Sequence, residues 1–373
     1  MSRIIFVSVA ILVLIFMNTY AYQRFIARLE LLNIYKRLLK WLMILMTLCE
    51  IGYTLMLQSD TLNLTLYTLF SSFVGVSFML FCVALIYDIF HTPLHKIPFD
   101  ASRRLMLKML LDVVMLGLAF SYILRGFING KKAPVLNEVE IFIEGLSKEF
   151  VMVQISDVHV GKTLGKDFLA GVVDEINKND ADLVVITGDL ADVKASQAGG
   201  MLESLSQINA RFGTYFVPGN HEYFYGVKDM MEYLEYLGVN VLFNRSMLID
   251  DSFYLAGVGD LAGRRFKMFE PDLKKALAQT KDSLPTILLS HQPKIAKELK
   301  NERVDLVVSG HTHGGQIFPF GLLVLLDQPY LSGLYQHSPK TQIFVSNGVG
   351  YWGPPVRVLA HSEIVKIRLK PKP

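Results

Sequence analysis

Four long apolar stretches fill the first third of the chain. They cover residues 4–23, 41–59, 63–87 and 105–124. About 20 apolar residues in a helix span the ~30 Å hydrocarbon core of a bilayer, so each stretch predicts a transmembrane helix. The first stretch has no small-residue cleavage site at its end and is followed by many basic residues. These features favour a retained helix over a cleaved signal peptide.

Two carboxylates interrupt this apolar pattern. Glu50 lies in the second stretch and Asp112 in the fourth, where Lys108 stands one helical turn away. An ionised side chain at the centre of a membrane helix costs about 2.5 kcal/mol or more. We therefore expect both carboxylates to pair inside the bundle, with Lys108 or with hydroxyl groups. A polar pathway or a substrate contact is the alternative interpretation.

The charges of the connecting loops predict an orientation. The first loop is rich in Lys and Arg, the second, near residues 59–60, has none, and the third contains Lys96, Arg103 and Arg104. Positively charged loops stay in the cytoplasm. Four crossings then place the C-terminal part of the chain outside the cytoplasm. If residues 105–124 lay in the membrane interface instead, that part would be cytoplasmic.

The pattern changes at residues 129–134, which contain Gly and Pro and predict a linker between a transmembrane domain (1–128) and a second domain (135–373). In the second domain, short β-rich runs alternate with helical stretches, as is typical of α/β folds. Strands are expected at residues 151–155, 183–186, 215–217, 253–258, 286–289, 306–308 and 343–345, and a helix at 169–177. Clusters of Gly, Asp, Asn and His follow these strands, where α/β domains gather their chemistry.

Composition supports this division and excludes several classes of protein. The chain is 51% hydrophobic and only 19% charged. Residues 1–132 carry 13 Lys/Arg against 6 Asp/Glu, whereas residues 133–373 carry 24 against 28. Disorder, collagen and a disulfide scaffold are excluded. Because the second domain is slightly acidic, non-specific nucleic-acid binding is not expected.

Five polar segments in the second domain form a pattern that favours metal binding. They are residues 156–159, 188–192, 219–222, 290–293 and 310–315. Asp157 and His159 are two residues apart, so both can face one ion from an extended loop, and His311 and His313 repeat this arrangement. Loops at neighbouring strand ends can bring Asp189, Asn220 and His291 to the same point.

Carboxylates and imidazoles without a thiolate suit Mn, Fe or Zn. Taken singly, each segment has an ordinary explanation as a turn, a loop or a helix cap. Their joint occurrence, each after an expected strand, favours a site for two divalent metal ions.

The five segments resemble the motif blocks of the calcineurin-like metallophosphoesterases, which read D-x-H, G-D-x-x-D, G-N-H-E/D, H and G-H-x-H. The resemblance covers about residues 151–369. Residues 310–316, 332–335 and 353–357 are similar to the membrane-associated bacterial subgroup and to the animal transmembrane metallophosphoesterases. The resemblance implies an α/β fold with two mixed β-sheets sandwiched between helices, here preceded by the transmembrane bundle.

The resemblance also implies a role for each site residue. The first metal would be held by Asp157, His159 and His313, the second by Asn220, His291 and His311, and Asp189 would bridge the two. His221 would not ligate, but would protonate the leaving oxygen or stabilise the transition state. Asp192 and Glu222 would orient ligand imidazoles. For these two residues, a plain position in a surface loop or at a helix start is an equal alternative.

These expectations define a membrane-anchored hydrolase with manganese, iron or zinc as cofactor. It would cleave a phosphodiester or pyrophosphate bond with a metal-activated hydroxide. Its partners would be the bilayer and a phosphorylated small-molecule or lipid-linked substrate. Some relatives are thought to cleave UDP-diacylglucosamine in lipid A biosynthesis, but that substrate is cytoplasmic and conflicts with the orientation above. A broad-specificity extracytoplasmic phosphoesterase and a non-catalytic metal-binding scaffold or sensor are the alternatives.

Two further features bear on the substrate. Residues 317–326 form an apolar run directly after the metal motif, which we interpret as a core strand with its connection, although a flap for an acyl chain is the alternative. Arg264, Arg265 and Arg357 could hold an additional phosphate, but we expect all three to be solvated.

Overall fold

The computed structural model describes residues 3–56, 63–96, 100–300 and 302–372. The chain divides into two compact units: Met1–Lys131 with Gly353–Val358, and Lys132–Trp352 with Leu359–Pro373. The loop expected near residues 59–60 and the last residues of the expected helix 41–59 lie outside the described residues.

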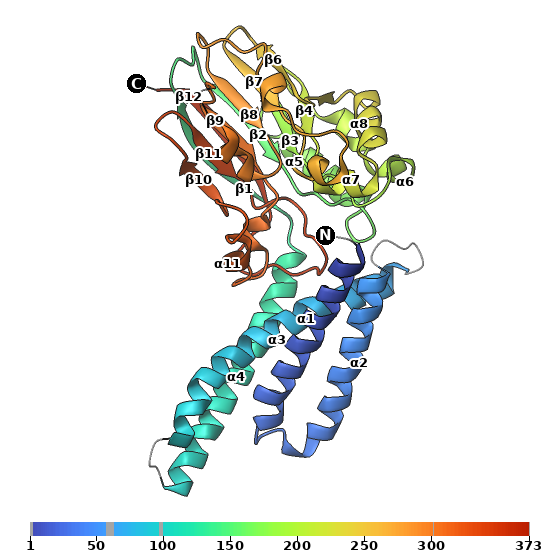
Figure 1. Cartoon of the computed structure of the whole chain (residues 1–373), viewed down its shortest axis with the longest axis vertical. Coiled ribbons are helices and arrows are strands. Elements are labelled where there is room, and N and C mark those ends of the chain that lie inside the picture. The colour runs from blue at the N-terminus through green and yellow to red at the C-terminus, as the bar shows by residue number, and fades with distance from the viewer. Residues whose placement is uncertain (1–2, 57–62, 97–99, 301, 373) are drawn as a thin grey trace. The chain divides into compact units, whose positions relative to one another are not determined.

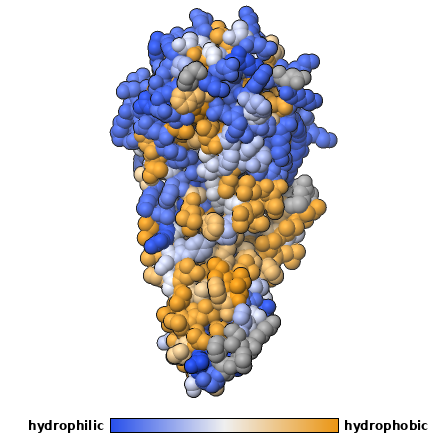
Figure 2. All heavy atoms as spheres, turned by 90° about the vertical axis from the view of Figure 1, so that its left-hand side faces the viewer, coloured by the Kyte–Doolittle hydropathy of each residue, from blue (hydrophilic) through white to orange (hydrophobic). Residues whose placement is uncertain are grey.

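The first unit is helical. Its long helices are α1 (Arg3–Arg24), α2 (Lys36–Leu55), α3 (Leu64–Lys96) and α4 (Ala101–Gly130), with short 3₁₀ turns at Ile26–Arg28 and Asn33–Tyr35. All four are long and apolar enough to cross a membrane. Their outward surface is dominated by hydrophobic side chains (Figure 2), as expected for helices that face lipid.

The carboxylate of Glu50 is fully buried among these helices. It accepts a hydrogen bond from the Asn18 amide at 2.6 Å and another from the Ser77 hydroxyl. Hydrogen bonds from two neighbouring helices, α1 and α3, thus replace water around this carboxylate, which agrees with the expected pairing inside the bundle.

Asp112 is also fully buried and paired. Its carboxylate accepts hydrogen bonds from the Tyr87 hydroxyl at 2.7 Å, from the Glu30 backbone N–H at 2.8 Å and from Lys108 at 3.3 Å. The expected pair on α4 is therefore present, and a hydroxyl from α3 completes it.

A short segment from near the C-terminus, Gly353–Val358, belongs to the helical unit. The Arg357 backbone N–H donates to the carbonyl of Gly126 at 3.0 Å. A Cβ atom on Gly130 would lie 2.2 Å from the Pro355 carbonyl oxygen, so only glycine permits this approach. Arg357 is 1% exposed, and the expectation that it is solvated is wrong.

The second unit contains two six-stranded sheets, with strand orders β1-β12-β2-β3-β4-β5 and β10-β11-β9-β8-β7-β6 (Figure 1). Both sheets are mixed: β2, β3 and β4 are parallel, as are β7, β8 and β9, whereas β12 runs antiparallel to β2 and β6 to β7. The strands are β1 (Val135–Ile143), β2 (Phe150–Ile155), β3 (Leu183–Thr187), β4 (Thr214–Val217), β5 (Asn240–Val241), β6 (Arg245–Ile249), β7 (Phe253–Gly257), β8 (Thr286–Leu289), β9 (Leu306–Ser309), β10 (Gly333–Gln336), β11 (Gln342–Val345) and β12 (Glu363–Pro371).

The helices of this unit are short, and α5 and α8 pack on the face of the first sheet that points away from the second. They are α5 (Lys166–Asn177), α6 (Ala195–Ala198), α7 (Asn220–Tyr225), α8 (Val227–Tyr236), α9 (Ala262–Phe266), α10 (Leu273–Ala276) and α11 (Gly321–Val324), with 3₁₀ turns at Gly199–Met201, Glu203–Gln207, Pro293–Glu298 and His313–Gly315.

Alternation along the strands explains the layers. In β3, Leu183 and Val185 pack in the core between the two sheets, whereas Val184 and Ile186 pack in the core shared with α5 and α8. Val307 of β9 likewise faces away from the core between the sheets. Successive side chains of a strand point to opposite faces, so each sheet can bury both faces. The expected fold class is confirmed: two mixed sheets sandwiched between helices.

Candidate metal centre

The candidate ligands lie in loops at strand ends and have an unusual backbone conformation. Asp157 and His159 follow β2 with φ of 53° and 52°, Asp189 follows β3 with φ of 50°, and His311 and His313 follow β9 with φ of 73° and 51°. Residues other than glycine rarely adopt positive φ. Here this conformation turns consecutive polar side chains to one point.

One group of ligand atoms forms around His159. Its Nε2 lies 3.1 Å from Nε2 of His313, which in turn lies 3.4 Å from the Asp157 carboxylate. All three residues are buried, and one ligand atom from each lies within 4.8 Å of the others. Two imidazole nitrogens that face each other beside a buried carboxylate are typical of a cation site.

A second group forms around His291. Its Nε2 lies 3.2 Å from the Asp189 carboxylate, 3.1 Å from Nδ1 of His311 and 3.1 Å from Oδ1 of Asn220. The other ring nitrogen of His291 contacts the Thr187 carbonyl at 2.8 Å, which fixes the ring.

Asp189 belongs to both sides of the site. Its Oδ2 is 3.2 Å from His291 and 3.9 Å from Nε2 of His159. The structure therefore brings all seven sequence-derived ligand candidates together, with one carboxylate between two sets. This geometry is compatible with a shared, bridging ligand.

His221 stands at the start of α7, beside the same carboxylate. Its Nε2 is 3.9 Å from Asp189, and its Nδ1 is 2.6 Å from Asp192. The same Asp192 oxygen lies 2.9 Å from Nδ1 of His159. Asp192 thus orients two imidazoles, and its own pKa is lowered by them despite its burial.

Glu222 has a different environment from the one expected. Its carboxylate does not orient an imidazole but accepts the backbone N–H groups of Asp189, Leu190, Ala191 and Gly219, at 2.7–3.4 Å. These N–H groups come from the loops after β3 and β4. Glu222 therefore joins the two loops that carry Asp189 and Asn220.

Mutual electrostatics set the charge of the central pair. Burial alone would raise the pKa of Asp189, but the imidazoles of His291, His221 and His159 hold it well below its usual value. Burial alone would lower the pKa of His291, but Asp189 and Asp157 hold it well above its usual value. Asp189 is thus ionised at neutral pH, as a bridging ligand must be.

The pKa values of His311 and His221 are shifted in opposite directions. Burial and the neighbouring His291 lower the pKa of His311 to about 3, so its ring is neutral and keeps a lone pair. At His221, burial lowers the pKa, but the carboxylates of Asp189 and Asp192 outweigh this effect and raise the pKa to about 9. One imidazole can therefore act as a ligand while the other carries a proton near neutral pH.

The donor set fits divalent metal ions. It consists of buried carboxylate, amide and imidazole atoms without any thiolate, which suits Mn, Fe or Zn. Two of the acids, Asp157 and Asp189, are both buried in this one site. Carboxylates this close would repel each other without positive charge between them.

Several residues near the site were not recognised from the sequence. Phe224 and Trp352 place their rings 5.4 and 6.1 Å from the His221 ring and are partly exposed. Asp260 is buried, accepts hydrogen bonds from Gln292 and from the Ala262 backbone, and has a pKa raised by burial to about 6. Of these residues, only Phe224 had a recognisable signal in the sequence, because it lies in the aromatic run directly after Glu222.

The apolar run after the metal motif is not a core strand, and that expectation is wrong. Ile317 is buried, but residues 318–326 lead through the short helix α11, on which Leu322 is 64% exposed. Leu326 follows α11 and is 84% exposed. The run therefore places leucines in solvent eight or more residues after His313.

The family model and the sequence relatives indicate one family. Residues 150–315 match the family described as calcineurin-like phosphoesterase. An uncharacterized metallophosphoesterase of Helicobacter pylori is 40% identical over 98% of this chain and 99% of that protein. A transmembrane protein with metallophosphoesterase domain from Danio rerio is 39% identical over 66% of this chain and 59% of that protein. A dimetal phosphatase structure from Danio rerio is 14% identical, covers 54% of this chain and 88% of its own, and has a TM-score of 0.36.

Proposed function

Since this chain belongs to the calcineurin-like metallophosphoesterase family and is a metal-dependent phosphoesterase, we propose that it hydrolyses a phosphodiester or pyrophosphate bond of a lipid-linked substrate at a site for two metal ions. The observation that carries this proposal is the position of Asp189 between two ligand groups. The first metal is assigned to Asp157, His159 and His313, and the second to Asn220, His291 and His311. Asp189 serves both.

Bound divalent metals would supply a hydroxide nucleophile near neutral pH and neutralise charge on the phosphoryl group. The chain's own contribution is to hold a proton at His221. Asp192 fixes Nδ1 of this ring at 2.6 Å, so Nε2 faces the site. With a pKa raised to about 9, the ring stays protonated at neutral pH and can protonate the leaving oxygen.

Two features support a lipid-linked substrate. The helical unit anchors the chain in the bilayer, so lipid-linked phosphates meet the catalytic unit at high effective concentration. The exposed leucines around α11 follow closely after His313 and offer an apolar surface to an acyl chain. Partners of the protein are then the bilayer and a phosphorylated lipid or small molecule.

The membrane arrangement is part of the proposal. Residues 1–128 form a multi-pass domain with four crossings and residues 129–134 the linker. Residues 135–373, apart from Gly353–Val358, form the catalytic domain, on the extracytoplasmic face. A UDP-diacylglucosamine type of substrate, as in lipid A biosynthesis, fits only a cytoplasmic catalytic domain. The extracytoplasmic placement therefore favours a diester or pyrophosphate exposed on the outer face.

Hydrolysis assays on the full-length protein test this function. With Mn²⁺, Fe²⁺ or Zn²⁺ restored after chelation, we expect cleavage of bis(p-nitrophenyl) phosphate, and no turnover without metal. Release of headgroups from a membrane lipid extract should then identify the natural substrate. A metal-loaded protein that cleaves neither kind of substrate would contradict the proposal and favour a scaffold.

A matched pair of variants tests the lipid linkage. L322S/L326S removes two exposed leucines and should leave cleavage of the soluble diester unchanged, while cleavage of the lipid substrate in vesicles falls several-fold. Leu248→Ser, an exposed leucine on β6, is the control. Equal rates on vesicles for wild type and L322S/L326S would contradict a role of this surface in substrate access.

A further inference from the structure

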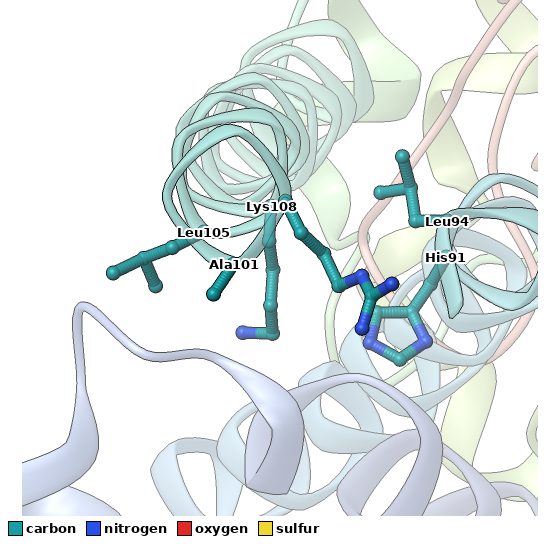
Figure 3. Close-up of a pocket in the computed structure, with 6 residues that line it drawn as sticks. His91, Leu94, Ala101, Leu105 and Lys108 are labelled. Atoms are coloured by element: carbon teal, nitrogen blue, oxygen red, sulfur yellow. The ribbon is translucent and has the colours of Figure 1, made fainter. Parts of the chain in front are cut away.

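A second polar site lies in the helical unit, where α3 ends and α4 begins. A hollow of about 200 Å³ is lined there by His91 and Leu94 from α3 and by Ala101, Arg104, Leu105 and Lys108 from α4. Figure 3 shows the side chains of His91 and Lys108 reaching toward the same space, with Leu94 and Leu105 beside them. The pocket shares no residue with the candidate metal centre.

The polar side of this pocket is held in place by its surroundings. Lys108 donates to the Arg28 carbonyl at 2.7 Å and lies 3.3 Å from both Asp112 and Glu30. The ring of His91 stacks on Tyr87 at 5.1 Å. The nitrogen atoms that line the pocket therefore keep their positions without a ligand, which lowers the entropy cost of binding one.

The charges of the surrounding segments favour an anion. Arg28 lies 2.8 Å from Asp88 and 3.2 Å from Nδ1 of His91, so this carboxylate neutralises one of the cations. Lys108 is likewise paired with Glu30 and Asp112, and Arg24 shares Asp88 with Arg28. The four cations Arg24, Arg28, Arg104 and Lys108 therefore stand against three carboxylates, which leaves one positive charge in excess. Among the described residues that line the pocket, Arg104 and Lys108 are basic and none is acidic.

The other side of the pocket is apolar and continues along the helices. Leu105 is exposed, and Met109 one turn further along α4 is exposed as well, as is Phe90 on α3. A ligand with a charged head and a hydrocarbon tail matches this division, because its tail can lie along these side chains. A free anion would leave the apolar side without a partner.

We infer that this pocket binds the phosphate headgroup of an anionic phospholipid. Basic pockets between transmembrane helices near one membrane surface are suited to such headgroups. Arg104 would bind the phosphate oxygens, and the ring nitrogen of His91 that does not contact Arg28 would donate a further hydrogen bond. Lys108, whose donors are used by Arg28, Asp112 and Glu30, would contribute charge alone, and an acyl chain would follow Leu105 and Met109. The lipid would be a second ligand of the protein, bound in addition to any substrate.

Native mass spectrometry of the full-length protein tests this inference. The protein is exchanged from detergent into equal amounts of dioleoyl phosphatidylglycerol and dioleoyl phosphatidylcholine, and the retained lipids are counted. Wild type should retain one phosphatidylglycerol. Arg104→Gln removes one charge-assisted contact and should lower this occupancy about tenfold. Arg103→Gln, an exposed neighbour that does not line the pocket, should behave like wild type.

A second variant and a second anion make the result decisive. Ala101→Phe fills the pocket without changing its charge and should also remove the lipid, even if Arg104→Gln fails to fold. Retention of the lipid by a folded Ala101→Phe variant, or equal loss in Arg103→Gln, would overturn the inference. So would displacement of the lipid by inorganic phosphate alone, because the acyl chain would then add nothing to binding.

Discussion

The backbone is strained at most of the residues whose side chains approach the metal positions. Five of the seven candidate ligands have positive φ, among them Asp157, Asp189 and His313. Each such conformation costs of order 1–3 kcal/mol and persists only where the surroundings enforce it. The parallel strands of both sheets supply that rigid support, so the ligands are arranged before any ion arrives.

Two substitutions should separate metal binding from proton transfer. Asp189→Asn removes the shared charge, and we expect loss of at least one metal and of nearly all activity. His221→Ala keeps the ligand set and should retain both metals, while turnover falls about 10²–10⁴-fold. Metal content by mass spectrometry and rates on a diester with a poor leaving group check both. Asp174→Asn, on the exposed face of α5, serves as control. Near wild-type turnover in His221→Ala would contradict the assignment of the acid.

Asp260 should make the stability of the metal-free protein depend on pH. Burial raises its folded pKa to about 6, above the unfolded value of about 3.9. Below pH 4 both states are protonated and no cost arises, whereas above pH 6 folding must hold a buried charge. The advantage of Asp260→Asn over wild type in the free energy of unfolding should therefore grow from pH 4 to pH 7, toward a limit of about 3 kcal/mol, and its melting temperature should rise with it. A constant difference across this range would contradict the shift.

Helix α7 joins the loops after β3 and β4, which carry site residues. Glu222 makes this connection, because its one carboxylate binds backbone N–H groups from two strand-end loops. Each of its oxygens accepts two of these bonds. The position of Glu222 within α7 thus matters as much to the arrangement of the site as the ligands themselves.

Glu222→Gln should test this connection. The amide keeps the size of the side chain but turns an NH₂ group toward two backbone donors, which leaves them unsatisfied. Buried unsatisfied donors cost about 1–3 kcal/mol each, so we expect a lower melting temperature and weaker metal binding. Glu175→Gln on α5 is a control outside this network. A melting temperature equal to that of wild type would show that the loops hold each other without Glu222.

The sequence predicted some elements well and others poorly, for physical reasons. Hydrophobic runs such as 183–186 become strands because both faces of the sheets are buried. The run at 317–326 is also apolar, although it contains Pro319 and Gly321, but forms an exposed turn of helix, since an apolar run alone does not reveal its neighbours. The pairing of β1 with β12, more than 200 residues apart, leaves no local signal either. The same holds for Glu222, whose partners are backbone atoms.

Membrane topology decides which substrates the whole molecule can reach. A periplasmic reporter such as alkaline phosphatase, fused after Lys132, should be active if four crossings carry the chain outward. The same reporter fused after Lys40, at the basic N-terminal end of α2, should be inactive. Activity only of a cytoplasmic reporter after Lys132 would place the catalytic domain inside and make a cytoplasmic sugar-nucleotide lipid the better substrate.

Gly130 should be essential to the helical unit. A methyl group there would meet the Pro355 carbonyl at 2.2 Å. We expect Gly130→Ala to displace Gly353–Val358, to lower the melting temperature and to open this segment to proteases. Gly117→Ala, on the same helix with nothing within 4 Å, should be neutral or slightly stabilising. Equal effects of the two substitutions would contradict this role of the segment.

Because Gly353–Val358 packs with the helices, the chain passes between its two units three times, not once. A water-soluble fragment that begins at the linker would lack the helices on which Val356 packs, at Gly75 and Gly126. Removal of the membrane helices would thus leave Gly353–Val358 without the residues on which it packs. Biochemists who want this enzyme in solution should redesign that hexapeptide or keep the anchor.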